Sequence, residues 1–283
     1  MDNFYYDQAE GLRRMLAGPK PRVFTFLSAV ARNEKNSTLV NLGASLARTG
    51  NSVLMLDACI ASTGILSHLD LQSEKMSLLE AASRKCLIND AIAAAPQGFG
   101  IAALMRARPR TKKQLAEQLR LLDTSFVDFA DQADVVMVDA ELDEDDSLPL
   151  SMLNEGEIVV LVSPDAASIK SAYALIKRLN SRFGRRPFGV LVTGASEKRA
   201  QIVFQNMAQA ASRYLAVRLD SLGSVPSDEH ISRAAQLGRT VIDAFPMASA
   251  SVAFRNLAGY FADSGMTAAR LSGMGLSNAG LVA

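Results

Sequence analysis

Residues 28–41 read Ser-Ala-Val-Ala-Arg-Asn-Glu-Lys-Asn-Ser-Thr-Leu-Val-Asn, and they follow an apolar stretch, Val23 to Leu27, that predicts a buried strand. After them, apolar residues recur at helical spacing up to Gly50, which is a stop signal for a helix. Strand, loop, lysine and helix in this order indicate a phosphate-binding loop. Such a loop needs glycines so that backbone N–H groups can close on phosphate oxygens, yet residues 28–41 contain none. We interpret this stretch as a phosphate loop that has kept its lysine, Lys35, and lost its glycines.

The composition bounds the class of protein. A chain of 283 residues, 49% of them hydrophobic, can bury one large core. The net charge of +1 gives no global support to nucleic-acid binding, and no run of about 18 apolar residues indicates a membrane span. The first residues lack a signal-peptide pattern, and the two cysteines, Cys59 and Cys86, suit a reducing compartment and show no metal-ligand spacing. We therefore expect a cytoplasmic protein with no nucleic-acid partner and no metal-ion site.

Apolar runs alternate with helical patterns along the rest of the chain. Further strands are predicted near residues 52–57, 133–139, 158–162, 188–192 and 216–225, and helices near 112–129, 167–182, 197–214 and 228–237. Continuous apolar strands separated by helices favour a parallel sheet that is covered on both faces. We predict an α/β domain with a doubly wound, mainly parallel sheet. Ligands of such sheets bind at the carboxyl ends of the strands, where Lys35, Asp57 and Asp139 fall.

The first 20 residues stand apart from this domain. One helical face carries Tyr5, Ala9, Leu12 and Leu16, and residues 18–21 then break the helical pattern with one glycine and two prolines. This helix either caps its own domain or docks into the groove of a partner. We divide the chain into residues 1–20, an appended helix and linker, residues 21–264, the α/β domain, and residues 265–283, a flexible tail.

A family resemblance begins in that helix. The residues Asp7-Gln8-Ala9-Glu10-Gly11-Leu12-Arg13 resemble the DQAxxLR activator motif of the FlhG (FleN) group, flagellar-number regulators within the MinD/ParA family of P-loop ATPases. The resemblance extends over roughly residues 5–262. It includes the runs Ser163–Lys177, Val217–Pro226 and Ala253–Ala258, and it is weakest at the nucleotide site and in residues 96–130.

The resemblance implies partners and a cofactor. Residues 5–16, and within them Asp7, Gln8, Ala9, Leu12 and Arg13, would contact an FlhF-like GTPase of the signal-recognition type. Gln8 would act in that partner's GTP hydrolysis, since a glutamine amide can orient an attacking water. Flagellar basal-body or regulatory proteins are further expected partners. Family members also associate with the inner membrane through a C-terminal helix, but three glycines in the tail, Gly273, Gly275 and Gly280, disfavour such a helix here.

The resemblance also places a nucleotide site. Matching the family residue by residue, ATP and Mg²⁺ would be held by Lys35, Asn36, Ser37, Asp57, Asp139 and Thr193. Several neighbours depart from the pattern: Val30 stands in place of a signature lysine, Cys59 in place of a second aspartate, and the acidic run 141–146 in place of a small loop. One carboxylate about 4 Å from a phosphate charge costs roughly 4 kcal/mol at an effective dielectric of about 20, half of a micromolar affinity.

These departures predict that ATPase activity is lost or weakened, that no cofactor binds tightly, and that Asp57 and Asp139 are relics. Lys35 and Asp139 would then satisfy each other's charge. The alternative is an active MinD/ParA-type ATPase that controls the placement of a cellular structure, because carboxylates can also bind magnesium. A basic segment, residues 106–113, is interpreted as a solvated face or as a surface for an acidic partner, anionic lipid or nucleic acid.

Overall fold

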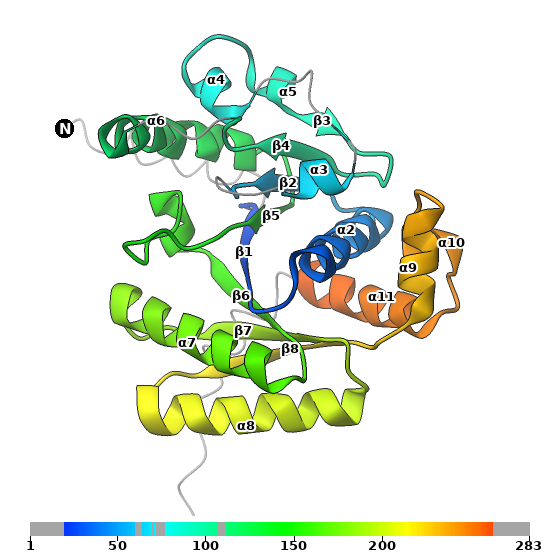
Figure 1. Cartoon of the computed structure of the whole chain (residues 1–283). Coiled ribbons are helices and arrows are strands. Elements are labelled where there is room, and N and C mark those ends of the chain that lie inside the picture. The colour runs from blue at the N-terminus through cyan, green and yellow to red at the C-terminus, as the bar shows by residue number, and fades with distance from the viewer. Residues whose placement is uncertain (1–19, 60–63, 70, 72–76, 107–110, 263–283) are drawn as a thin grey trace, which may run out of the picture.

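The computed structural model describes residues 20–59, 64–69, 71, 77–106 and 111–262 (Figure 1). The predictions for the N-terminal helix, including Asp7, Gln8, Ala9, Leu12 and Arg13, lie outside these residues. So do the predictions for the tail and for residues 107–110 of the basic segment.

The described chain contains an eight-stranded sheet in the order β3-β4-β2-β5-β1-β6-β7-β8. Its strands are β1 (Arg22–Ser28), β2 (Val53–Asp57), β3 (Ala93–Ala94), β4 (Gly100–Ala103), β5 (Val135–Asp139), β6 (Glu157–Val162), β7 (Phe188–Thr193) and β8 (Leu219–Val225). Neighbouring strands are parallel except for β3 and β4. The predicted mainly parallel sheet is therefore confirmed.

Helices cover both faces of the sheet (Figure 1). They are α2 (Arg32–Arg48), α3 (Ile65–His68), α4 (Leu78–Ala82), α5 (Ile88–Ala91), α6 (Lys112–Ala130), α7 (Ala166–Phe183), α8 (Glu197–Leu215), α9 (Glu229–Gln236), α10 (Val241–Ala244) and α11 (Ser249–Ala262), with a short 3-10 helix, η1, at Ser151–Asn154. None of the helices in the described part of the chain is long and apolar enough to cross a bilayer.

Strand alternation explains why two separate cores form. Along β5, Val136 and Val138 pack into a core shared with α6, α7 and α8, whereas Val135 and Met137 pack into a second core shared with α2 and α11. Successive residues of a strand point to opposite faces, so a strand that is covered on both sides reads as a continuous apolar run. Phe261 anchors α11 to β1, because its ring meets that of Phe24 edge to face at 4.6 Å.

Candidate functional site

Strand register brings the predicted acidic residues together. Asp57 ends β2, Asp139 ends β5, and the two residues are direct partners in the parallel ladder. Lys35 approaches from the first turn of α2, and its Nζ lies 2.6 Å from Asp139 Oδ1. The two side chains are 4% and 0% exposed. Of the six predicted nucleotide-site residues, Lys35, Asp57 and Asp139 thus form one buried cluster, in which Lys35 pairs with Asp139.

A thiol completes this cluster. Cys59 Sγ lies 3.6 Å from Lys35 Nζ and 3.7 Å from the backbone oxygen of Asp139. Burial raises the pKa of the Cys59 thiol, and the neighbouring charge of Asp139 raises it further, so the group is protonated at neutral pH. Burial, the largest single effect, disfavours the ammonium of Lys35, but the charge and hydrogen bond of Asp139 together with nearby Cys59 and Glu141 outweigh it, so the pKa of Lys35 is raised. The cluster therefore holds its own cation.

Asp57 organises the loop that follows β2. Its carboxylate accepts hydrogen bonds from the backbone N–H groups of Cys59 and Leu66, each at 3.3 Å. A Cβ atom on Gly64 would lie 1.9 Å from Asp57 Oδ2, so the close approach of this backbone requires glycine. Sequence reasoning missed Gly64, although a glycine shortly after the strand-end aspartate was an available signal. Burial and the charge of Asp139 together raise the pKa of Asp57 to about 6.

The backbone before Lys35 is wound into a helix. Helix α2 begins at Arg32, and the backbone N–H of Lys35 donates to the carbonyl of Ala31 at 3.0 Å. Further back, the N–H of Val30 donates to Ser28 Oγ at 3.1 Å. Positive-φ backbone is absent from residues 28–35, a stretch that the structure describes in full. Phosphate nests form where successive N–H groups converge in alternating αR and αL conformations, so these residues do not form one.

Two carboxylates, Glu34 and Glu141, lie at the first turn of α2. Glu34 Oε1 lies 3.5 Å from the place that a Cβ atom on Gly194, after β7, would take. Glu141, at the start of the acidic run, pairs with Arg32 at 3.3 Å. Further along that run, Asp146 pairs with Arg178 of α7. The acidic run is thus held against two helices, while its central residues 143–145 are exposed.

The other three predicted nucleotide-site residues do not bond to the Lys35–Asp139 pair. Asn36 is buried and its Nδ2 donates to the carbonyl of Gly64 at 3.4 Å, while its Oδ1 has no hydrogen-bond partner among the described residues. Thr193 ends β7, and its buried Oγ1 also lacks a partner within the described ranges. Ser37 is half-buried, and its backbone carbonyl accepts from Asn41 Nδ2 at 2.8 Å.

Comparison with known proteins establishes the family. Over 225 residues the chain is 31% identical to the antiactivator FleN of Pseudomonas aeruginosa, with 79% of this chain and 80% of that protein covered. The chain belongs to the MinD/ParA family. No family model matches the sequence.

Solved structures show the same fold. MinD from the MinC:MinD cell division complex of Aquifex aeolicus superposes with a TM-score of 0.63 at 18% identity, covering 91% of this chain and 98% of that one. MinD of Pyrococcus horikoshii, determined with Mg-ADP, gives a TM-score of 0.61 at 17% identity, covering 85% of this chain and 95% of that one. The predicted MinD/ParA-like α/β fold is confirmed.

Proposed function

We propose that this MinD/ParA-family chain regulates flagellar number or assembly through protein contacts, with ATP hydrolysis lost or weakened. Support for the flagellar role comes from its identity to FleN and from the activator-like motif at residues 7–13. Residues 5–16 would dock on an FlhF-like GTPase, and basal-body or regulatory proteins would be further partners. We propose a cytoplasmic location, with any contact to the inner membrane peripheral.

The environment of Lys35 supports the proposed loss or weakening of ATP hydrolysis. In a working phosphate loop the lysine reaches the β- and γ-phosphates while backbone N–H groups surround them. Here the ammonium of Lys35 is buried against Asp139, and its backbone N–H is bonded within α2. Glu34 adds a negative charge beside the turn. These residues do not fit Mg-ATP in this arrangement.

The same holds for the metal ion. Ligand atoms of Asp57, Cys59 and Asp139 lie within 4.8 Å of one another, a spacing that could hold a cation. Two of these groups already contact the ammonium of Lys35, Asp139 at 2.6 Å and Cys59 at 3.6 Å. A magnesium ion would have to displace this ammonium, and it would meet a protonated thiol instead of a carboxylate at Cys59.

Titration calorimetry of the full chain with Mg-ATP tests the loss of nucleotide binding. We expect no binding at micromolar concentration, no turnover above background, and no change of molecular mass by light scattering when ATP is added. The variant Lys35→Ala is the control, because heat that it retains does not come from this site. A micromolar dissociation constant that Lys35→Ala abolishes would refute the lost-ATPase proposal.

An active ATPase switch is the alternative proposal, and the presence of three family-matched residues supports it. Lys35, Asp57 and Asp139 are all present and lie together at the carboxyl edge of the sheet. In that case the Lys35–Asp139 pair opens when nucleotide arrives. Counting flagella in a strain that lacks this protein separates the two proposals. The variant Lys35→Met/Asp139→Leu should restore the normal number of flagella if the chain acts by protein contacts alone. It should fail to restore that number if the chain acts through ATP. Normal flagella in the deletion strain would refute the flagellar role.

A further inference from the structure

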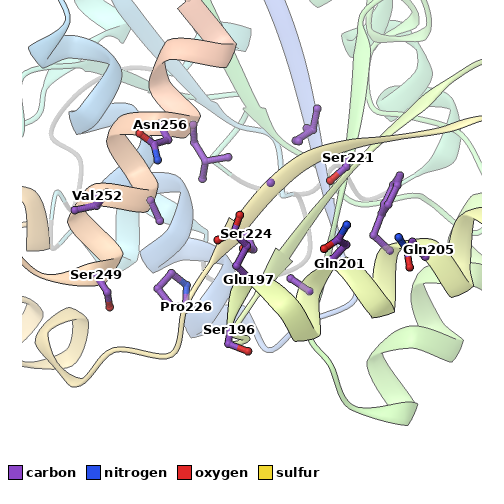
Figure 2. Close-up of a pocket in the computed structure, with 16 residues that line it drawn as sticks. Ser196, Glu197, Gln201, Gln205, Ser221, Ser224, Pro226, Ser249, Val252 and Asn256 are labelled. Carbon is purple, nitrogen blue, oxygen red and sulfur yellow. The ribbon is translucent and has the colours of Figure 1, made fainter.

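A hollow of roughly 840 Å³ runs along the outer edge of the sheet beside β8 (Figure 2). We call it the β8 trench. It lies between α8, which contributes Gln201 and Gln205, and α11, which contributes Asn256, while β8 itself contributes Ser221 and Ser224. The trench shares no lining residue with the cluster around Lys35, so it is a separate site from the one described above.

The backbone of β8 is open toward this trench. Strand β8 is last in the sheet order and pairs only with β7 among the described strands. Within the described ranges, no backbone hydrogen bond from another element reaches residues 220–225 on the open side. Natural edge strands are usually protected by charged residues, above all lysine, by proline, by a bulge or by a short length. Strand β8 has seven residues and contains neither lysine nor proline; its protection is limited to one charged residue, Asp220, and one bulge, so it is partial.

A bulge changes the outward-facing residues of this edge. The register with β7 shifts between Val190 and Leu191, which makes Leu222 the extra residue on β8. Leu222 turns into the core, and the small residues on either side, Ser221 and Gly223, are exposed. Gly223 has a φ of +119°, which side-chain-bearing residues rarely adopt. A Cβ atom at this position would also lie 3.3 Å from Leu257 Cδ2 of α11.

The shape and chemistry of the trench select its occupant. The trench is concave, so the same concave edge of a second copy would leave it unfilled, whereas a single extended chain would enter it. Amides and hydroxyls dominate its polar lining, and such groups bond to any backbone without demanding charge. Glu197, at the start of α8, is the single charged residue that lines it in the described chain. Charge complementarity therefore calls for a basic residue at that end of the occupant.

We propose that the β8 trench binds an extended segment of a partner protein, which adds as a strand to β8 and places a lysine or arginine beside Glu197. Main-chain hydrogen bonds to the open edge would supply affinity, and alternate side chains would enter the space between α8 and α11. Strand addition of this kind needs no nucleotide.

Two labelled hexapeptides, Lys-Ser-Val-Ser-Val-Ser and Ser-Val-Ser-Val-Ser-Lys, test this with the full chain by fluorescence anisotropy. We expect one of the two peptides to bind more tightly. A strand that adds to β8 in one fixed direction brings the lysine of only one of them to Glu197. Replacing Glu197 by Gln should lower the affinity for the tighter peptide by about two- to fivefold and leave the affinity for the other peptide unchanged. Two further peptides carry methyl groups on the backbone nitrogens of alternate residues, one on the odd and one on the even positions. Methylation of one set should abolish binding and methylation of the other should not, because only alternate backbone amides face β8.

A matched pair of variants locates the binding. Ser221→Lys places a lysine on the open edge and should reduce affinity by about tenfold or more, whereas Ser181→Lys makes the same change on an exposed position of α7 and should have no effect. Absence of binding at millimolar peptide, or binding that ignores both backbone methylation and Ser221→Lys, would overturn the proposal. So would a dimer that Ser221→Lys dissociates, or competition by a peptide of residues 263–283, since these would assign the trench to a second copy or to the chain itself.

Discussion

Lys35 and Asp139 depend on each other because both are buried. Removing one partner of such a pair leaves an uncompensated charge, which typically costs about 3–5 kcal/mol, while replacing both by apolar residues of similar volume is often neutral. We expect Lys35→Met and Asp139→Leu each to lower the free energy of unfolding by several kcal/mol, and the double variant to recover most of the loss. Urea denaturation measures this, with Lys198→Met on the exposed start of α8 as the control. Single variants as stable as the parent would show that the pair does not hold the site.

Asp57 makes stability depend on pH in an unusual direction. Its pKa of about 6 in the folded chain exceeds the value near 3.9 in the unfolded chain, so the folded state binds the proton more tightly. The resulting stabilisation is complete below about pH 4 and is lost as the pH rises through about 6, a total of about 3 kcal/mol. Other carboxylates add their own slopes, so the difference between the parent and Asp57→Asn is the quantity to measure. We expect this difference to change between about pH 4 and 6 in urea midpoints, and a constant difference would contradict the assigned pKa.

At the scale of one element, helix α2 begins without a side-chain cap. Ala31 holds the N-cap position with φ −58° and ψ 145°, and no side chain accepts from the first turn there. Serine at an N-cap stabilises a helix by about 1 kcal/mol relative to alanine, because its hydroxyl accepts from a free N–H group. Ala31→Ser should therefore raise the urea midpoint, whereas Ala31→Val, which offers no acceptor, should not. Equal behaviour of the two variants would mean that α2 does not begin at Arg32.

The elements differ in how far they could be predicted from the sequence. Long apolar runs such as those ending in Asp57 and Asp139 predict central strands, because strands covered on both faces need apolar residues at every position. The short strands β3 and β4 were not predicted, since residues 93–103 consist largely of alanine and glycine and show no period. The start of α2 could not be predicted either. The lack of glycines argues against a phosphate nest before Lys35, but it does not indicate that these residues form the first turn of the helix.

At the scale of the whole molecule, strand order decided what the sequence could reveal about the site. Parallel strands end at one edge, so the meeting of Lys35, Asp57 and Asp139 followed from their positions at strand ends. The approach of Gly64 to Asp57 depends on how one loop folds back, and the β8 trench depends on which strand is last in the sheet. Local periodicity predicts neither feature, because both arise from contacts between distant segments.

The last prediction concerns how the molecule reaches its partner. Under the proposed loss of nucleotide binding, ATP has no means to release or withhold another segment, so the predicted activator-like helix at residues 5–16 should act with or without ATP. Leu12 would anchor this helix in the groove of an FlhF-type GTPase, where truncating a buried leucine typically costs about 2–5 kcal/mol. Gln8 would act in the partner's chemistry and add little affinity.

Gln8→Ala should therefore leave binding nearly intact and abolish stimulation of GTP turnover, whereas Leu12→Ala should weaken binding itself. Titrated binding and GTP turnover of the partner, each with a peptide of residues 1–20 and with the full chain, give both quantities. Asn3→Ala removes a side-chain amide outside the motif and serves as the matched control, which should change neither quantity. Equal stimulation by the parent and by Gln8→Ala would refute the role of the glutamine. Stimulation that needs ATP would show instead that the switch behind the helix still works.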